Sequence, residues 1–212
     1  MYKAFGKRMM DIVLSACGLI VLSPVFLILA IAVVIDDPGP VFFAQKRVGR
    51  KKDGQITYFK LYKFRSMKMS TPHDTPTHLL ENPEQYITRV GKVLRKTSLD
   101  ELPQIWNIFK GDMSIIGPRP ALWNQDDLVA EREKYGANDV MPGLTGWAQI
   151  NGRDELEIPV KAEFDGEYVE KMSLVMDMKC FLGTIKSVLK SDGVVEGGTG
   201  EMAKGNKKSE ML

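Results

Sequence analysis

The stretch that decides the fold reads TSLDELPQ at residues 97–104, and it is followed by KGDMS at 110–114 and GPRP at 117–120. Two adjacent carboxylates, Asp100 and Glu101, stand where a helix is expected to begin. One interpretation is structural, because Ser98 and Glu101 fit the S-x-x-E capping box that satisfies the free amides of a first helical turn. The same pattern also suits a pair of acidic groups presented to a ligand.

Pro103 argues against a helix that begins directly after Ser98. The amide of residue 103 would have to bond the carbonyl of Leu99, and proline has no amide hydrogen. A helix that begins at Asp100 avoids this, places both carboxylates at its N-terminus, where free N–H groups favour anions, and ends at Gly111. The apolar residues of the stretch recur at helical spacing and are expected to bury the other side; they are Leu102, Ile105, Trp106 and Phe109. From the residues alone, the cap and the anion site both remain open.

The composition excludes some classes of protein. A chain of 212 residues with net charge +2 and 44% hydrophobic residues has room for one domain and an appendage, and its bulk charge indicates neither a nucleic-acid partner nor a disordered chain. Cys17 and Cys180 form neither a metal-binding spacing nor a disulfide framework, so they are expected to be reduced thiols. His73 and His78, in a proline-rich loop over residues 70–83, fit no zinc motif.

The N-terminal segment is long and apolar. Residues 12–35 carry no charge. This uncharged segment is long enough to cross a bilayer as one helix and too long for a cleaved signal peptide. Two features argue against a simple spanning helix. Ser23-Pro24 falls near the middle, where proline breaks the helix, although kinked spanning helices also contain proline. Basic residues flank both ends, whereas the positive-inside rule asks for asymmetry; they are Lys3, Lys7, Arg8, Lys46, Arg47, Arg50, Lys51 and Lys52. A helix that enters, bends and returns satisfies both observations.

The remaining patterns predict a small mixed domain. Strands are expected at 41–46 and 55–64 around a basic turn at 49–54, which is either a solvated tip or a contact for anionic head groups. Helices are expected at 84–96, 121–135, 156–171 and 174–190, and the glycine- and lysine-rich residues 191–212 are expected to be a disordered tail. On the second strand, Lys63 shares a face with Phe59 and Leu61 and so looks inward.

Taken together, the blocks around residues 97–120 resemble the bacterial sugar transferase family, the polyprenyl-phosphate phosphoglycosyl transferases, and specifically their small monotopic class. LYKFRSM at 61–67, MPGLTGWAQ at 141–149 and NGR at 151–153 match further blocks of that family. The resemblance covers nearly everything before the tail and implies a re-entrant membrane helix over residues 1–36 with its break at Ser23 and Pro24. The expected fold is therefore α+β and mainly helical, with this helix, a compact cytosolic catalytic domain over 37–190 that contains a small β-hairpin, and a tail that lies outside the resemblance.

The resemblance also implies an activity. The expected reaction moves a sugar-phosphate from a nucleoside diphosphate sugar, expected to be a UDP-sugar, to polyprenyl phosphate and releases UMP. It is the first membrane step of glycoconjugate assembly, at the cytosolic face of the bacterial inner membrane. Asp100 is the expected nucleophile, which forms an aspartyl-phosphosugar intermediate, and Glu101 is the expected metal ligand or base. Both carboxylates would hold Mg²⁺, since approaching phosphates repel each other and hard cations screen them.

The resemblance assigns further residues to the site. Phosphate-binding residues are expected among the cations Lys63, Arg95, Arg119 and Arg153, and Arg119 is fixed between Pro118 and Pro120. Support for the site is expected from Pro118, Pro120, Asp165 and Tyr168, although by themselves the last two would be surface residues of a helix. Two rival hypotheses remain, a non-catalytic module that binds anionic lipid and a metal-dependent phosphodiesterase. A homo-oligomer is left open.

Overall fold

The computed structural model describes residues 2–71, 82–152 and 156–190. The expectations for Arg153, for the two histidines and for the tail lie outside these residues. The described chain is mainly helical with a small antiparallel hairpin, as expected, and it also contains a second, two-stranded parallel sheet that the sequence patterns did not predict.

The N-terminal segment forms two helices that meet at a sharp bend. After a wide helical turn at Tyr2–Gly6, α1 covers Lys7–Val21 and α2 covers Ser23–Asp36, and the two axes differ in direction by 60°. Pro24 occupies the first turn of α2, where its missing amide hydrogen costs nothing, and the Ser23 hydroxyl donates to the carbonyl of Ile20 at 2.8 Å. The predicted break is therefore confirmed. Among the described residues no single helix could cross a bilayer, whereas this bent pair meets the requirement of length and apolar composition.

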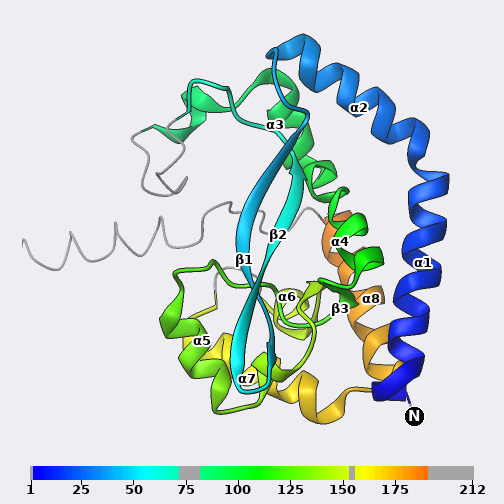
Figure 1. The fold of residues 1–212 in the computed structure, drawn as a ribbon, viewed down its shortest axis with the longest axis vertical. Helices are drawn as coiled ribbons and strands as arrows, with labels where there is room; N and C mark the ends of the chain where they lie inside the picture. The colour runs from blue at the N-terminus through cyan, green and yellow to red at the C-terminus, as the bar shows by residue number, and fades with distance from the viewer. Residues whose placement is uncertain (1, 72–81, 153–155, 191–212) are drawn as a thin grey trace, which may run out of the picture.

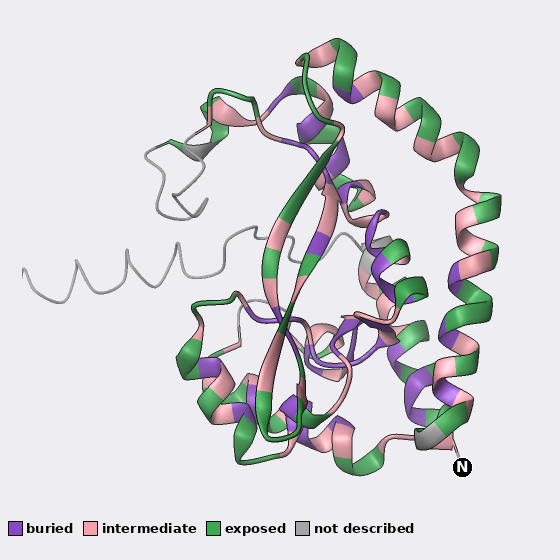
Figure 2. Cartoon of the chain, in the orientation of Figure 1, coloured by how far each residue is buried: buried purple, intermediate pink, exposed green. Residues whose placement is uncertain are grey.

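The bent pair carries most of its apolar surface outward. Figure 1 shows α1 along one side of the molecule and α2 returning over the top to the start of the hairpin. In Figure 2 nearly all of α2 is exposed or half-buried, and Val33 is its buried residue. The exposed large apolar side chains of the pair are Met9, Ile12, Val13, Leu14, Ile20, Val21, Leu27, Ile28, Ile31, Val34 and Ile35.

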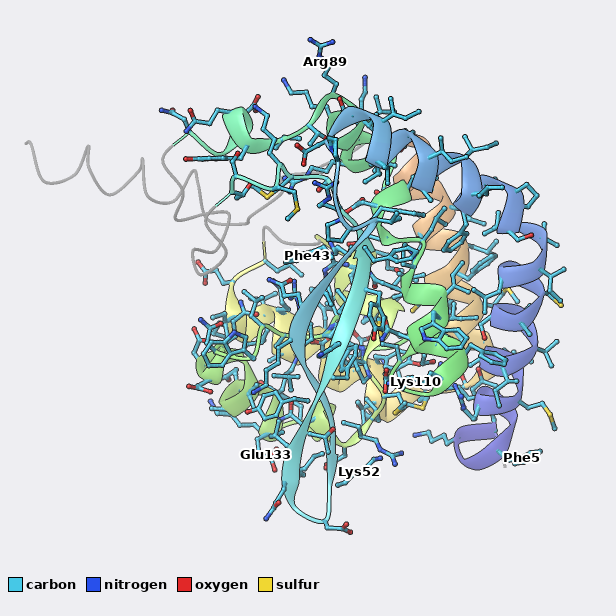
Figure 3. All side chains as sticks on the ribbon, turned by 45° about the horizontal axis from the view of Figure 1, so that its top comes forward. Phe5, Phe43, Lys52, Arg89, Lys110 and Glu133 are labelled. Carbon is cyan, nitrogen blue, oxygen red and sulfur yellow. The ribbon has the colours of Figure 1, made fainter. Side chains whose placement is uncertain are left out.

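The hairpin is longer than predicted. Strand β1 covers Phe42–Lys52 and pairs antiparallel with β2, Gln55–Phe64, so that Phe43 lies opposite Lys63. Asp53 and Gly54, both with positive φ, make the tight turn. The predicted basic turn at 49–54 is therefore wrong in its extent, because pairing resumes after an irregularity between Val48 and Lys51. Lys51 pairs with Glu133 and Asp139, and Figure 3 shows Glu133 near the same end of the hairpin as Lys52.

The segment with the two carboxylates departs from the predicted helices. The helix expected at 84–96 is divided into a 3-10 turn η3, Pro83–Tyr86, and α3, Arg89–Lys96, because Thr88 caps α3 by accepting from the amide of Gly91. The helix expected to begin at Asp100 begins later: Leu99–Glu101 is a 3-10 turn, η4, and α4 covers Gln104–Lys110. Ser98 has a φ of 56° and makes no side-chain cap, so the capping-box interpretation is wrong.

The second half wraps around the hairpin. The helix expected at 121–135 is shorter, α5 at Asp126–Glu133, because Ala121 and Leu122 instead pair with β1. Strands β3, Ser114–Ile116, and β4, Gly143–Thr145, form the parallel pair. The other elements are η5, Ala137–Asp139, α6, Trp147–Ile150, α7, Ile158–Lys171, and α8, Leu174–Lys190, which has the predicted bounds.

The core is divided into small clusters that fix the segments around the carboxylate pair. Leu61 of β2 packs with Ile108 of α4 and with Met113, all buried. Phe64 packs with Val33 of α2 and with the start of the carboxylate segment through the neighbouring apolar residues Leu99 and Leu102. Burial of these side chains contributes roughly 1.5–3 kcal/mol each and holds β2 and α4 against each other.

Candidate active site

The two carboxylates lie on the turn η4 between α3 and α4. Asp100 is buried, with 4% of its surface exposed, and the side chain of Glu101 exposes 19%. Ser98, in the left-handed conformation, reverses the chain after α3, and the amide of Glu101 bonds back to the carbonyl of Ser98. Because Pro103 then precedes the first residue of α4, the pair is held by a turn rather than by the first turn of a helix.

Cations from two distant segments meet this pair. Lys63 Nζ lies 3.0 Å from Glu101 Oε1 and 3.7 Å from Asp100 Oδ2. Arg119 Nη2 donates to the same Glu101 Oε1 at 2.9 Å. Burial alone would raise the pKa of Glu101, but Arg119 and Lys63 outweigh it and hold the pKa of this carboxyl far below its usual range. Glu101 is therefore a stable anion that organises two cations.

The position of Lys63 follows from the packing of β2. As the alternation of the strand predicts, Lys63 lies on the same face as Leu61, which is packed on α4. Asn107 of α4 strengthens this junction: its carbonyl oxygen accepts from the amide of Tyr62, and its amide donates to the carbonyl of Lys60. Asn107 is fully buried and was not predicted as a site residue. The buried residues of α4 are Gln104, Asn107 and Ile108, whereas Trp106 and Phe109, which were expected to be buried, are exposed.

The loop that carries Arg119 is held by close backbone contacts. The amide of Gly117 donates to the carbonyl of Thr145, and the amide of Gly143 donates to the carbonyl of Pro118, both at 2.8 Å. A Cβ on Gly143 would lie 2.1 Å from the nitrogen of Gly117, so these backbones can approach only as glycines. Arg47 Nη1 donates to the carbonyl of Pro120 at 3.1 Å. The glycine-rich block at 141–149 therefore clamps the Arg119 loop, a role that the sequence did not reveal.

The other predicted site residues lie in different surroundings. Arg95 is half-buried and its Nε donates to Ser66 Oγ at 2.9 Å. Asp165 is 1% exposed and is paired with Arg132 at 2.6 Å; burial raises the pKa of Asp165, although Arg132 opposes this. Tyr168 is also 1% exposed and donates to Asp177 Oδ1 at 2.7 Å. The expectation that the last two would by themselves be surface residues is wrong, because α7 packs its inner face against α5 and β3.

The carboxylate pair suits a magnesium ion in part. Among residues 2–71, 82–152 and 156–190 no group of three or more His, Cys, Asp and Glu side chains converges on one point. Mg²⁺ is usually held by one or two carboxylates together with water and substrate phosphates, so Asp100 and Glu101 provide the donor set that such a site needs from the protein. Mg²⁺ stays a prediction.

One buried carboxylate, one cation-bound carboxylate and two cations thus meet at one place, and such a set of groups suits the binding of phosphates. The chain matches the model of the family described as bacterial sugar transferase over residues 2–191, and it therefore belongs to the bacterial sugar transferase family.

Curated relatives narrow the enzyme class. The chain is 42% identical over 192 residues to the UDP-glucose:undecaprenyl-phosphate glucose-1-phosphate transferase of Escherichia coli, covering 84% of this chain and 39% of that protein. It is 38% identical over 197 residues to the UDP-N-acetylgalactosamine-undecaprenyl-phosphate N-acetylgalactosaminephosphotransferase of Aeromonas hydrophila, covering 90% of this chain and 45% of that protein. It thus spans less than half of either relative. The names of these relatives agree with the expected class, a phosphoglycosyl transferase.

A third relative matches along nearly its whole length. The uncharacterized sugar transferase EpsL of Bacillus subtilis is 40% identical over 189 residues, which cover 89% of each chain.

Proposed function

We propose that this protein transfers a sugar-1-phosphate from a UDP-sugar to polyprenyl phosphate, with release of UMP. The observation that carries this proposal is the convergence of Lys63 and Arg119 on the adjacent carboxylates Asp100 and Glu101. The names of the relatives supply the general reaction, and the site supplies groups that suit it. Two anionic phosphates must meet, and cations fixed in a partly buried site lower the cost of that approach.

The nucleophile proposed is Asp100. A carboxylate oxygen of Asp100 attacks the phosphorus that bears the sugar, the bond from that phosphorus to the bridging oxygen breaks, and UMP leaves with the electron pair. An oxygen of the polyprenyl phosphate then attacks the same phosphorus, which frees the Asp100 carboxylate and forms the polyprenyl-diphosphate sugar. This division into two displacements is the advantage of covalent catalysis.

Glu101 is proposed to organise charge rather than to accept a proton. Its pKa is held low by Arg119 and Lys63, so it is a weak base near neutral pH. Bound Mg²⁺, held by Asp100 and Glu101, would neutralise charge on the donor's diphosphate. When the phosphates enter, Lys63 and Arg119 can exchange part of their contact with Glu101 for phosphate oxygens, since both side chains are long and donate several hydrogen bonds.

The bent helix pair is proposed to be a re-entrant membrane anchor at the cytosolic face of the bacterial inner membrane. Both of its ends are tied to the same globular body, which is what a helix that returns requires. At the start, Arg8 donates to the carbonyls of Ile108 and Phe109 of α4. At the end, Asp36 accepts from the amide of Val90, and Asp37 pairs with Arg65.

The test uses the full chain in membranes with polyprenyl phosphate and a panel of UDP-sugars. Release of UMP together with a lipid-linked sugar product supports the proposal and identifies the donor. Free sugar phosphate without lipid product would instead indicate a phosphodiesterase. Binding to anionic vesicles with no product from any donor would indicate a lipid-binding module and would contradict the proposal.

A further inference from the structure

Helix α1 carries a buried polar stripe. Lys7, Asp11 and Ser15 of α1 follow one another at intervals of four residues and are 9%, 4% and 3% exposed, whereas most other residues of this helix are apolar and outward. Buried charged groups are costly unless they are paired. An anchor that served only to hold the protein at a membrane would not need them, so the partners of the stripe indicate a second role.

Arg8, beside the stripe, holds the end of the helix that follows the carboxylates. Its Nη1 donates to the carbonyl of Ile108 at 2.6 Å and its Nη2 to the carbonyl of Phe109 at 2.7 Å. These carbonyls belong to the last turn of α4, where few backbone donors remain, and the carbonyl of Ile108 also accepts from the amide of Gly111 at 3.1 Å. Because α4 follows Glu101 after two residues, its placement against α1 fixes the carboxylate turn.

Asp11 holds the strand that leads to Arg119. Its Oδ1 accepts from the amide of Ile115 at 2.9 Å, in the middle of β3. Strand β3 pairs with β4, and the amide of Ile115 is bonded by the Asp11 side chain of α1. Ile115 lies four residues before Arg119, and the intervening Gly117 and Pro118 are clamped by β4, so a shift of β3 is transmitted to the guanidinium.

Lys7 fixes the position of α1 along its own axis. Its Nζ lies 2.6 Å from Asp177 Oδ2, and Tyr168 donates to the other oxygen of this carboxylate at 2.7 Å. Tyr168 Oη also lies 3.2 Å from the carbonyl of Ile116, the last residue of β3. The same end of α1 is thus tied to α8 directly and to β3 through the tyrosine.

We propose that Asp11 and Arg8 are positioning residues of the phosphate-transfer site. Helix α1 holds β3, the strand that leads to Arg119, through Asp11, and it holds α4 through Arg8. It thereby sets the separation of Arg119 from Asp100 and Glu101. This inference rests on the proposed function. It gives α1 a part in the geometry of catalysis that is separate from anchoring.

The first experiment compares Asp11→Ala with Asp11→Asn in the full chain in membranes. Loss of the acceptor is expected to lower kcat by roughly 10- to 100-fold, with a smaller change in KM, because small misplacements of catalytic groups are costly. Asp11→Asn keeps an oxygen acceptor and is expected to recover most of the activity. Ser15→Ala is the matched control: Ser15 lies on the same stripe and its hydroxyl bonds within α1, to the carbonyls of Asp11 and Ile12. Equal kcat in Asp11→Ala and the wild type would overturn the inference.

A double-mutant cycle separates positioning from general destabilisation. In an Arg119→Gln background, Asp11→Ala is expected to cost less than about threefold further in kcat, because its effect acts through the arginine. Losses that multiply independently would indicate a merely structural role and would contradict the inference. If Asp11→Ala fails to fold, Arg8→Gln, which removes the two bonds to α4, is measured in the same cycle with the same two outcomes.

A measurement without activity separates this inference from the proposed function. Hydrogen exchange of the peptide that contains Ile115 is expected to quicken in Asp11→Ala and to stay unchanged in Ser15→Ala. Unchanged exchange in both would refute the contact on which the inference depends. A wild-type chain that is inactive with every donor would refute the proposed function and leave the exchange result to stand by itself.

Discussion

At the scale of single residues, the site depends on one oxygen atom. Oε1 of Glu101 accepts from Lys63 at 3.0 Å and from Arg119 at 2.9 Å, while Asp100 lies 3.7 Å from the same lysine. The two adjacent carboxylates thus have different surroundings. Glu101 is paired with two cations. Asp100 is more buried than Glu101 and lies farther from Lys63. Different surroundings suit different tasks, which is why the attack is assigned to Asp100.

Replacing the proposed nucleophile is the direct test at this scale. Asp100→Asn keeps the size of the side chain and removes the charge, so turnover is expected to fall by at least about 10³-fold. Intact-mass measurement after incubation with the UDP-sugar is expected to show a sugar-phosphate adduct on the wild type and none on the variant. An Asp100→Asn protein with full turnover would exclude the covalent route.

The charge of Glu101 gives a prediction about pH. Its pKa is depressed in the folded protein, so its favourable interactions are present above the unfolded pKa and are lost as the pH falls through the folded value. Arg119→Gln removes one of the two cations and is therefore expected to raise the pKa of Glu101. The acid limb of the kcat/KM profile is then expected to move to higher pH by about one unit. Lys134→Gln is the control, because it breaks an exposed pair with Glu131 on α5. An unchanged acid limb in Arg119→Gln would contradict the assigned role of the arginine.

At the scale of elements, two junctions position the site. The parallel pair β3–β4 brings the backbones of Gly117 and Gly143 into contact and so fixes the loop with Arg119. The hairpin strand β2 rests on α4 through Leu61 and Asn107 and so fixes Lys63. Neither junction is made by the site residues themselves, and each joins segments that are far apart in the sequence.

A methyl group at the parallel pair tests the first junction. In Gly143→Ala the new Cβ would lie 2.1 Å from the nitrogen of Gly117, so the two strands must separate. A loss of about 1–3 kcal/mol in unfolding free energy is expected, together with a fall in kcat as the Arg119 loop moves. In Gly18→Ala, the control inside α1, the nearest atoms lie at an ordinary 3.7 Å, and stability is expected not to fall because alanine also favours the helix. Equal melting temperatures for wild type and Gly143→Ala would contradict the clamp.

At the scale of the whole molecule, the ends of the bent pair α1–α2 differ in role from its middle. Arg8, Asp36 and Asp37 tie both ends to the catalytic body, while the middle of the pair exposes large apolar side chains. Such an exposed surface is unfavourable in water and suits the interior of a bilayer. This arrangement fits a helix that enters and leaves on one side.

Cysteine labelling tests that arrangement. With a membrane-impermeant maleimide at pH 8, the wild type in vesicles is expected to stay unlabelled at both thiols. The protein itself leaves Cys17 exposed, and the proposed membrane insertion would cover this thiol with lipid. Cys180 is buried, and burial raises its pKa to about 12. Both are expected to label after denaturation.

The same reagent also reports topology. In a background in which both native cysteines are replaced, Lys3→Cys and Lys52→Cys are expected to label from the same face of sealed vesicles. Labelling from opposite faces would show that the segment spans the membrane and would refute the re-entrant anchor.

Several features could be predicted from the sequence by itself because their causes are local. The break at Ser23-Pro24 was predictable since proline cannot continue a helix, and α8 was predictable from its helical periodicity. The inward direction of Lys63 followed from strand alternation. The carboxylate pair was recognised through the resemblance of three blocks in order, and the sequence alone left it as either a cap or a site.

The remaining features were decided by the tertiary structure, because they depend on residues far apart in the chain. A turn stands where a helix was expected to begin at Asp100, because Ser98 in the left-handed conformation reverses the chain. The helix expected from residue 121 begins later, because its first residues pair with β1. Asp165 and Tyr168 are buried because α7 packs against partners distant in sequence. The contact of Asp11 with Ile115 joins residues 104 positions apart, and no local pattern of charge or periodicity encodes such a distance.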